Sequence, residues 1–378
     1  MSEKVLIIGA LSTSLVNFRG SLLRELVTSG YEVHAAANEL SKDKKSNQRL
    51  TYMGVFAHSV PMVRTGVNPI KDLYTFFSLV MLYWKLQPDV VLAYTSKPVI
   101  WGGLASCFSL NAKFFAMITG LGYAFTGEAV GKRLLIKYVI QMLYKMGLHN
   151  ASAVIFQNPD DATEFRKLRL ISNDKKTVVV NGSGVNLDDF PLSDLPQGQI
   201  NFLMIARLLG DKGVREYVDA GKLLNNDHIS AHLHLVGPAD SNPDALSQDE
   251  IKTWQNLEWF TWHGSSDDVR PYIKNSRVYV LPSYREGTPR TVLEAMSMGR
   301  PIITTDTPGC RETVINGDNG FLVPIKNSKE LALAMRKFID SPDLAISMGK
   351  KSRNIVERKY DIKKVNPVMI KALGLDEN

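Results

Sequence analysis

Four charged side chains in the second half of the chain have types and spacings that could do chemistry. Glu286 and Glu294 are eight positions apart, and Arg207 and Lys212 are five positions apart across a glycine turn. Carboxylates accept hydrogen bonds from sugar hydroxyls, whereas a guanidinium and an ammonium can converge on one diphosphate. The pattern indicates a site for a phosphorylated, hydroxyl-rich ligand. The alternative is a solvated helix with two surface acids and a loop with two exposed cations.

The segment around the two glutamates predicts a strand, a loop, a helix and a further strand. The apolar run 278–281 predicts a buried strand, and Pro289 stands where a helix would begin, with Thr288 as its N-cap. The helix is expected to end at Gly299, and the next strand covers 302–305. In α/β sheets such loops bind ligands, and the first amides of a helix suit a phosphate.

The start of the chain predicts a second unit of the same kind. A β-branched run, 4–9, ends in glycine and is followed by a polar loop over 10–17, a helix ending at Gly30 and a strand over 31–37. No G-x-G-x-x-G motif is present, so a dinucleotide site is not supported.

Length and composition indicate a globular protein of two domains. The chain has 378 residues, 44% hydrophobic and 22% charged, which exceeds the usual size of one hydrophobic core. A proline-rich polar stretch over 188–198 predicts the boundary. We therefore expect domains at 1–190 and 191–360, with 361–378 packing back on the first domain.

The charge is concentrated in the first half. Residues 1–190 hold 21 basic and 14 acidic side chains, while the whole chain carries a net charge of +7. A basic half indicates an anionic partner, which could be nucleic acid, a phospholipid surface or a phosphorylated substrate. The alternative is a soluble basic surface without a partner.

Two cysteines without metal-ligand spacing, Cys107 and Cys310, predict a reducing compartment and no zinc site. No signal peptide is recognisable, and the most apolar helical stretch, 74–84, is too short to cross a bilayer. These features predict a cytoplasmic protein that is soluble or peripheral on the inner face of the cytoplasmic membrane.

The motifs of the second half resemble those of the family 4 retaining glycosyltransferases. The resemblance rests on Glu286 and Glu294, on the Ala-Met-Ser-Met-Gly-Arg-Pro run over 295–301, and on Asn-Gly-Asp-Asn-Gly-Phe-Leu-Val-Pro over 316–324. It extends over nearly the whole chain and is densest over 201–324. It implies an α/β protein of the GT-B fold, with two Rossmann-like domains facing a central crevice.

This resemblance implies a UDP-sugar donor and a role for each charged residue. Arg207 and Lys212 would neutralise the departing diphosphate, Glu294 would hold the ribose, and Glu286 would hold a hydroxyl of the donor sugar. No metal and no cofactor are expected. The further donor contacts expected are Gly9, Ser14, Gly287, Thr288, Pro289, Arg290, Thr291 and Val292.

The same resemblance places the acceptor on the first domain. Many relatives carry a histidine near the position of Thr119; this chain does not, so no catalytic histidine or other base is assigned. For Arg19, a solvated residue in the first helix is the alternative. The expected acceptor-side residues are Asn17, Arg19, Lys97, Thr119, Gly120 and Gly122.

Three shorter runs narrow the resemblance to bacterial transferases that add N-acetylgalactosamine to an undecaprenyl-diphosphate-linked sugar. They are the runs at 204–207, 237–243 and 120–122. Such enzymes build the O-antigen of lipopolysaccharide, capsule or protein-linked glycans. A polyprenyl-diphosphate acceptor would account for the basic first domain and for two amphipathic stretches, 68–86 and 134–146, that could contact a membrane. A buried packing helix is the alternative for 68–86, and plain solvation is the alternative for 134–146.

Other functions remain open from the sequence. A GT-B epimerase or phosphorylase could share the frame, and a transferase could use another donor sugar or a non-lipid acceptor. A nucleic-acid-binding protein would explain the charge but lacks a recognised motif. A non-catalytic nucleotide-sugar sensor would bind the donor and release nothing.

Overall fold

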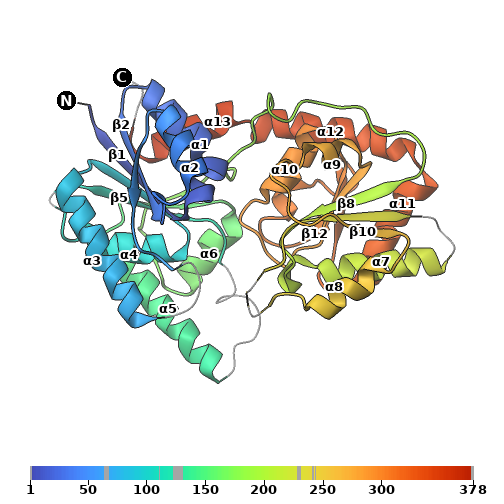
Figure 1. The fold of residues 1–378 in the computed structure, drawn as a ribbon, viewed down its shortest axis with the longest axis horizontal. Helices are drawn as coiled ribbons and strands as arrows, with labels where there is room; N and C mark the ends of the chain where they lie inside the picture. The colour runs from blue at the N-terminus through green and yellow to red at the C-terminus, as the bar shows by residue number, and fades with distance from the viewer. Residues whose placement is uncertain are drawn as a thin grey trace. The chain divides into compact units, whose positions relative to one another are not determined.

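The chain folds into two α/β units. The computed structural model describes residues 2–63, 68–109, 111–121, 131–227, 231–240, 242 and 244–375. One unit comprises the chain up to Ser183 together with the chain from Val365 onward, and the other runs from Gly184 to Lys364. In each unit, helices cover both faces of a parallel sheet (Figure 1).

The described part of the first unit contains a seven-stranded sheet in the order β3-β2-β1-β4-β5-β6-β7. Side chains alternate between its faces, because Val5 and Ile7 join one hydrophobic cluster while Leu6 and Ile8 join the other. The strands are β1 Lys4–Leu11, β2 Glu32–Asn38, β3 Phe56–Ser59, β4 Val90–Tyr94, β5 Lys113–Ile118, β6 Ala153–Phe156 and β7 Thr177–Val179.

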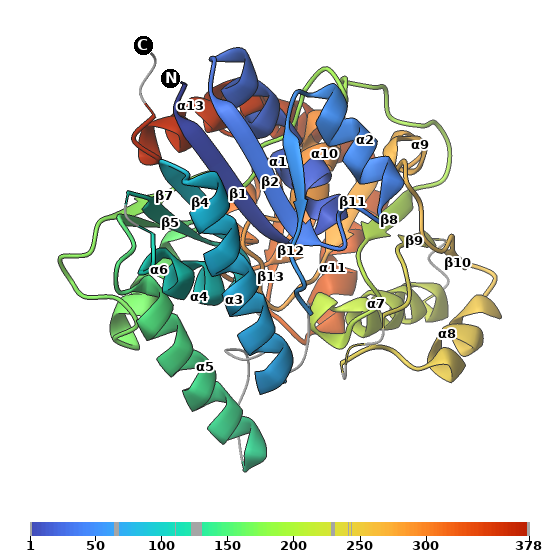
Figure 2. The same cartoon turned by 60° about the vertical axis from the view of Figure 1, so that its left-hand side comes forward.

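Helices α1 and α13 pack on one face of this sheet, whereas α3, α4, α5 and α6 pack on the other. Helices α3 and α5 both lie against α4, as Figure 2 shows. The helices of the unit are α1 Ser12–Thr28, α2 Lys44–Tyr52, α3 Pro69–Leu86, α4 Ser96–Ser106, α5 Lys132–Leu148, α6 Pro159–Lys167 and α13 Ile362–Ala372, which begins three residues before the unit.

One predicted loop of the first unit is wrong. The polar loop over 10–17 does not exist, because β1 continues to Leu11 and α1 begins at Ser12. Leu15 and Val16 are buried, so the apolar face of the helix extends to its first turn and outweighs the polar residues between. The stretch over 95–98 that follows β4 is also mostly helix, since α4 begins at Ser96.

The second unit contains a six-stranded sheet in the order β10-β9-β8-β11-β12-β13. Its strands are β8 Asn201–Ile205, β9 His232–Val236, β10 Phe260–Trp262, β11 Val278–Leu281, β12 Ile302–Thr305 and β13 Gly320–Val323. Its helices are η1 Gly210–Lys212, α7 Val214–Asn226, α8 Gln248–Gln255, α9 Arg270–Lys274, α10 Arg290–Ser297, η2 Arg311–Thr313, α11 Ser328–Asp340 and α12 Asp343–Lys359. The strands predicted at 278–281 and 302–305 are confirmed.

Both sheets reverse their strand order at one place. In the first unit the reversal lies between β1 and β4, and in the second between β8 and β11. Loops that leave neighbouring strands at such a point diverge, and ligands of open α/β sheets bind there. The residues that follow these four strands are therefore candidates for a ligand site.

The stretch over 188–198 belongs to the second unit, whose division from the first falls between Ser183 and Gly184. Arg300 is fully buried and ties this stretch down, because its guanidinium donates to the carbonyl oxygens of Ser193 at 2.7 Å and Asp194 at 3.1 Å. At the other end of the chain, Met369 and Leu373 of α13 complete a hydrophobic cluster of the first unit.

Candidate active site

The centre of the candidate site is an ion pair between two neighbouring loops of the second unit. Lys212 follows β8 and Glu286 follows β11, and their Nζ and Oε1 atoms lie 2.5 Å apart. The side chains are only 16% and 18% exposed. A backbone hydrogen bond of 2.8 Å, from the Tyr284 amide to the Asp211 carbonyl, joins the same two loops. The strand-order reversal thus brings together two residues that the sequence separates widely.

Two glycines allow this close approach. Gly213 has φ +73°, and a Cβ there would lie 2.1 Å from the carbonyl oxygen of Pro282. Gly309 has φ +83°, and its Cβ would lie 2.1 Å from the carbonyl oxygen of Glu286. The Glu286 amide also donates to Pro308 over 3.0 Å. The loop that follows β12 therefore fixes the position of the Glu286 backbone.

The electrostatics of the pair favour the charged form of Lys212. Burial acts to lower the pKa of Lys212, but the Glu286 carboxylate outweighs it and leaves that pKa above the usual value. Burial raises the pKa of the neighbouring Asp211, against the opposing effect of Lys212. Such a cluster of coupled charges at the end of a strand is typical of a functional site.

Arg207 lies nearby but has its own carboxylate partner. Its guanidinium contacts Asp240 at 2.7 Å, and 37% of its side chain is exposed. Both Arg207 and Lys212 act on the pKa of Asp211, so the two cations lie within electrostatic range of one carboxyl group. Asp240 was not among the residues expected at the site. The sequence indicated it only by its position shortly after Gly237 and Pro238, which follow β9.

Helix α10 carries the second predicted glutamate. Glu294 is 7% exposed and accepts a 2.9 Å hydrogen bond from Nε of Arg290, one turn earlier. Burial raises the pKa of Glu294, although Arg290 opposes this effect. The arrangement presents a shielded carboxylate close to the start of the helix.

The start of α10 differs slightly from the prediction. Its N-cap is Pro289 and not Thr288, because Pro289 already has an extended backbone, with ψ of 107°. Thr291 lies in the first turn, where its hydroxyl accepts a 2.7 Å hydrogen bond from Tyr279 of β11. Val292 is fully buried, so only its backbone can face a ligand, while Gly287 is buried in the loop before the helix.

A second group of predicted residues gathers around Tyr94 in the first unit. A Cβ at Gly9 would lie 2.3 Å from the Tyr94 hydroxyl, and the Ser14 hydroxyl is 2.8 Å from that atom. The Arg19 guanidinium lies 4.9 Å from the centre of the ring. Arg19 is 3% exposed, so the alternative that it is solvated is wrong. Tyr94 had no signal of its own in the sequence beyond its place at the end of an apolar strand.

The remaining acceptor-side residues lie apart from this group. Lys97, in the first turn of α4, forms a buried 2.6 Å ion pair with Asp72 of α3. Thr119 and Gly120 follow β5 and are half-buried, and Asn17 is exposed on α1. Gly122 lies outside the described residues.

Across the described ranges, no group of three or more His, Cys, Asp or Glu side chains is placed to hold a metal ion. Over the same ranges, no helix is both long and apolar enough to cross a membrane.

Comparison with known proteins assigns both halves of the chain. Residues 20–187 match Glycosyltransferase Family 4, and residues 188–355 match Glycosyl transferases group 1. Sucrose-phosphate synthase from Thermosynechococcus elongatus has a similar fold, with a TM-score of 0.82 and 20% identity over 98% of each chain. The fold is therefore GT-B, and the chain belongs to the glycosyltransferases that combine these two domains.

Two curated relatives are similar over most of their length. The N,N'-diacetylbacillosaminyl-diphospho-undecaprenol alpha-1,3-N-acetylgalactosaminyltransferase of Campylobacter jejuni is 29% identical, over 92% of this chain and 94% of the relative. The UDP-Gal:alpha-D-GlcNAc-diphosphoundecaprenol alpha-1,3-galactosyltransferase of Escherichia coli is 27% identical, over 85% and 84%.

Proposed function

We propose that this glycosyltransferase moves a sugar from a UDP-sugar to a saccharide carried on a polyprenyl diphosphate, with retention of the anomeric configuration. The donor sugar is an N-acetylhexosamine, with N-acetylgalactosamine as the first choice, and the product belongs to a bacterial surface glycan or a protein-linked glycan. The observation that carries the proposal is the Lys212–Glu286 pair at the strand-order reversal. The two curated relatives, both named as transferases acting on undecaprenyl-diphosphate-linked sugars, supply the substrate class.

In this proposal the second unit binds the donor. The bond between the anomeric carbon and the diphosphate oxygen breaks, and its electron pair leaves with UDP. Arg207 and Lys212 stabilise the negative charge that develops on the diphosphate, which is worth several kcal/mol in a shielded site. As Lys212 turns to the diphosphate, the Glu286 carboxylate accepts a hydrogen bond from a hydroxyl of the donor sugar. The acceptor oxygen bonds to the same face of the carbon, and its proton passes to the departing diphosphate oxygen.

Helix α10 supplies the remaining donor contacts. Glu294 accepts hydrogen bonds from the ribose hydroxyls, and the backbone of Thr288, Arg290 and Thr291 lies where a helix start favours a phosphate. The charge on the leaving group is met by side-chain cations, so the proposal assigns no role to a metal or a cofactor.

The first unit binds the acceptor in this proposal. Asn17, Thr119 and Gly120 are the accessible candidates, because Arg19 is buried against Tyr94 and Lys97 is paired with Asp72. Arg19 and Lys97 therefore act as positioning residues at the carboxyl ends of β1 and β4.

A lipid-linked acceptor calls for contact with the membrane, and the outer faces of α3 and α5 provide it. Both helices pack on α4 with one side and leave the other side exposed. Lys71, Lys85 and Lys145 are exposed beside the apolar residues and complement an anionic lipid surface. The exposed apolar side chains are Ile70, Leu73, Tyr74, Phe77, Met81 and Trp84 on α3, and Leu134, Leu135, Ile136, Tyr138, Met142 and Met146 on α5.

The catalytic proposal is tested by measuring released UDP. The protein is incubated with a panel of UDP-sugars and excess EDTA, with and without polyprenyl-diphosphate-linked saccharide. Release that requires the lipid, survives EDTA and falls at least about 100-fold in Glu286→Gln supports the transferase. An α-linked product by NMR supports retention. Turnover of the donor without acceptor would instead identify an epimerase, and strict dependence on a divalent metal would refute the mechanism.

The membrane contact is tested by flotation with vesicles of phosphatidylglycerol. The double variant Tyr74→Asp/Tyr138→Asp should lose binding, because it places two carboxylates on the exposed apolar faces. Leu333→Asp/Ile346→Asp, at exposed positions of the second unit, is the matched control. Equal binding by the two double variants would place the contact elsewhere.

A further inference from the structure

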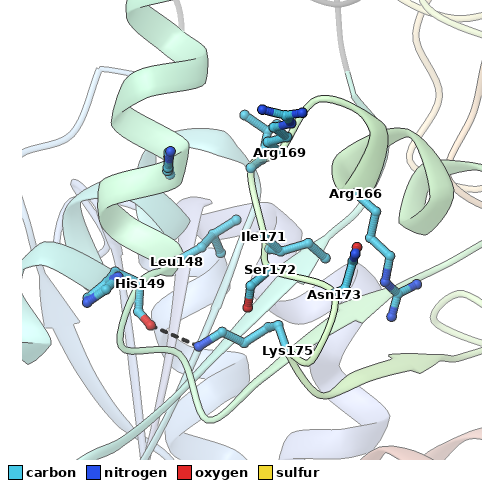
Figure 3. A pocket seen from close by; sticks show the side chains of 10 residues that line it. Leu148, His149, Arg166, Arg169, Ile171, Ser172, Asn173 and Lys175 are labelled. Atoms are coloured by element: carbon cyan, nitrogen blue, oxygen red, sulfur yellow. Dashed lines mark hydrogen bonds between the residues drawn. The ribbon is translucent and has the colours of Figure 1, made fainter.

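A cavity of about 550 Å³ lies in the first unit, beside the carboxyl end of α5. Four cationic side chains line it: Lys145, Arg166, Arg169 and Lys175. Leu148 and Ile171 are buried apolar residues of its wall. Its lining contains no carboxylate. Among the side chains labelled in Figure 3, Leu148 is the last residue of α5, Arg166 lies in the last turn of α6, and Arg169, Ile171 and Lys175 belong to the segment that precedes β7.

The cavity lies at the amino ends of the strands of the sheet, whereas Gly9 and Lys97 lie toward the carboxyl ends. Helix α5 ends at Leu148, shortly before β6 begins, and α6 ends at Lys167, shortly before β7 begins. Both helix ends therefore lie at the amino ends of the strands, whereas Gly9 lies in the carboxyl-terminal half of β1 and Lys97 follows β4. The cavity is separate from the residues of the first unit that were expected at the active site.

The negative charge of the nearby helix ends balances only part of this positive charge. The carboxyl ends of two helices carry roughly half a negative charge each, or about one in total. Lys175 satisfies one of them directly, since its ammonium donates to the carbonyl oxygens of His149 at 2.8 Å and Ala151 at 3.0 Å. Asp174 is an exposed carboxylate next to Lys175 in the chain. Four cations against about two negative charges leave the cavity positive.

Arg169 occupies a position where glycine is usual. It lies just after the end of α6, where its φ of +54° is left-handed and the amide of Leu170 donates to Phe165 over 2.9 Å. Helices commonly end in this way with a glycine, since a side chain there is unfavourable. The chain keeps an arginine at this place, and its guanidinium lines the cavity.

We propose that this cavity is a second anion site, which binds the phosphate group of a phosphorylated ligand. Its volume lies within the usual range for small-ligand sites. Lysine and arginine together suit a phosphate, and the absence of a lining carboxylate removes the competing partner. Lys145 is flanked by exposed Met142 and Met146, so the phosphate can belong to a lipid headgroup as well as to a soluble ligand.

The test compares two double variants of the whole protein. Lys145→Gln/Arg169→Asn removes two cations from the cavity, and asparagine tolerates the left-handed backbone. Lys167→Gln/Lys176→Gln removes the same charge from exposed neighbours that do not line the cavity. Inorganic pyrophosphate is titrated by calorimetry as the soluble probe. Vesicles of phosphatidylglycerol are the lipid probe, with phosphatidylcholine as their neutral counterpart.

We expect the cavity variant to lose one bound pyrophosphate, or to bind phosphatidylglycerol vesicles about tenfold more weakly, while the control variant behaves as the wild type. Loss in the first arm alone identifies a soluble ligand, and loss in the second alone identifies a lipid. Unchanged binding of both probes would overturn the proposal, as would an equal loss in the two variants. Neither readout requires transferase activity. The pyrophosphate readout also does not involve the proposed membrane contact of α3 and α5, so its failure is distinct from failure of the proposed function.

Discussion

Lys212 and Glu286 are 74 positions apart, yet the ammonium of one lies 2.5 Å from the carboxylate of the other. The two side chains follow β8 and β11, which are adjacent in the sheet. A departing diphosphate would compete with Glu286 for the same ammonium. The pair thus keeps Lys212 charged and positioned before the donor binds, and it links the cation for the leaving group to the carboxylate assigned to the sugar.

A double-mutant cycle tests this coupling. We expect Glu286→Gln and Lys212→Met each to lower kcat by about 100-fold or more, because each removes a charge used in the transition state. The double variant should be little slower than the worse single variant, since residues that act as a unit are not additive. UDP release under single-turnover conditions gives the four rates.

The exposed pair Lys222–Asp219, 2.9 Å apart on α7, is the matched control. Lys222→Met and Asp219→Asn should change kcat less than twofold, because exposed pairs contribute little. Additive losses in the Lys212–Glu286 cycle would show that the two residues act independently.

Glu294→Gln should increase the stability of the protein and weaken its binding of the donor. Burial raises the pKa of Glu294, so the folded state binds the proton of this carboxyl group more tightly than the unfolded state does. The stability contributed by this proton is present below the unfolded pKa of about 4.3 and is lost as pH rises through the folded pKa. Glutamine stays neutral, so the variant should gain stability relative to the wild type as pH rises above about 4.3.

Urea unfolding at several pH values in this range measures that difference, and the exposed Glu258→Gln provides the baseline. The KM for the donor should rise about tenfold in Glu294→Gln, since a charged acceptor for the ribose is lost. A pH-independent stability difference would contradict the assigned burial of the carboxylate.

Gly309→Ala should damage catalysis through the backbone of Glu286. The added Cβ would lie 2.1 Å from the Glu286 carbonyl oxygen, so the loop must move. Displacement of a catalytic group by about 1 Å costs about 100-fold, and kcat/KM should fall accordingly. Gly317→Ala is the control, because Gly317 has a similar φ of +81° but no atom within 4 Å of the added carbon. Similar activity of the two variants would refute the role of Gly309.

Arg300→Met should destabilise the second unit. Arg300 is fully buried, burial lowers its pKa to about 10, and its guanidinium donates to backbone carbonyls that include Ile273 and Met298. The variant leaves several buried carbonyl groups without donors, at about 1–3 kcal/mol each. Urea unfolding should show a loss of at least about 3 kcal/mol. Arg336→Met, at an exposed position of α11, should remain within about 0.5 kcal/mol of the wild type.

Elements with strong local patterns could be predicted from the sequence. The β-branched runs of β11 and β12 were found at their observed bounds, because a fully buried parallel strand reads as a continuous apolar run. The start of α1 was not found. Its first six residues contain serine, threonine and asparagine, which favour turns by local pattern, and only the burial of Leu15 and Val16 makes this stretch helical.

The candidate site, too, could be predicted only in part from the sequence. Residue types and spacing singled out Arg207, Lys212, Glu286 and Glu294, since each lies next to a recognisable strand end or helix start. Their partners were not found. Asp240 is 33 positions from Arg207, and nothing local to either residue indicates the contact.

The sequence by itself determined the fold class, the family and the four charged residues, because strand and helix periods, turn residues and short motifs are properties of neighbouring positions. Only the tertiary structure decided which charges meet. Glu286 pairs with Lys212, Arg207 with Asp240, and Arg19 packs on Tyr94. The physical reason is the order of the strands. Which strand lies beside which depends on the packing of the whole sheet, and that order brings distant loops within hydrogen-bond distance.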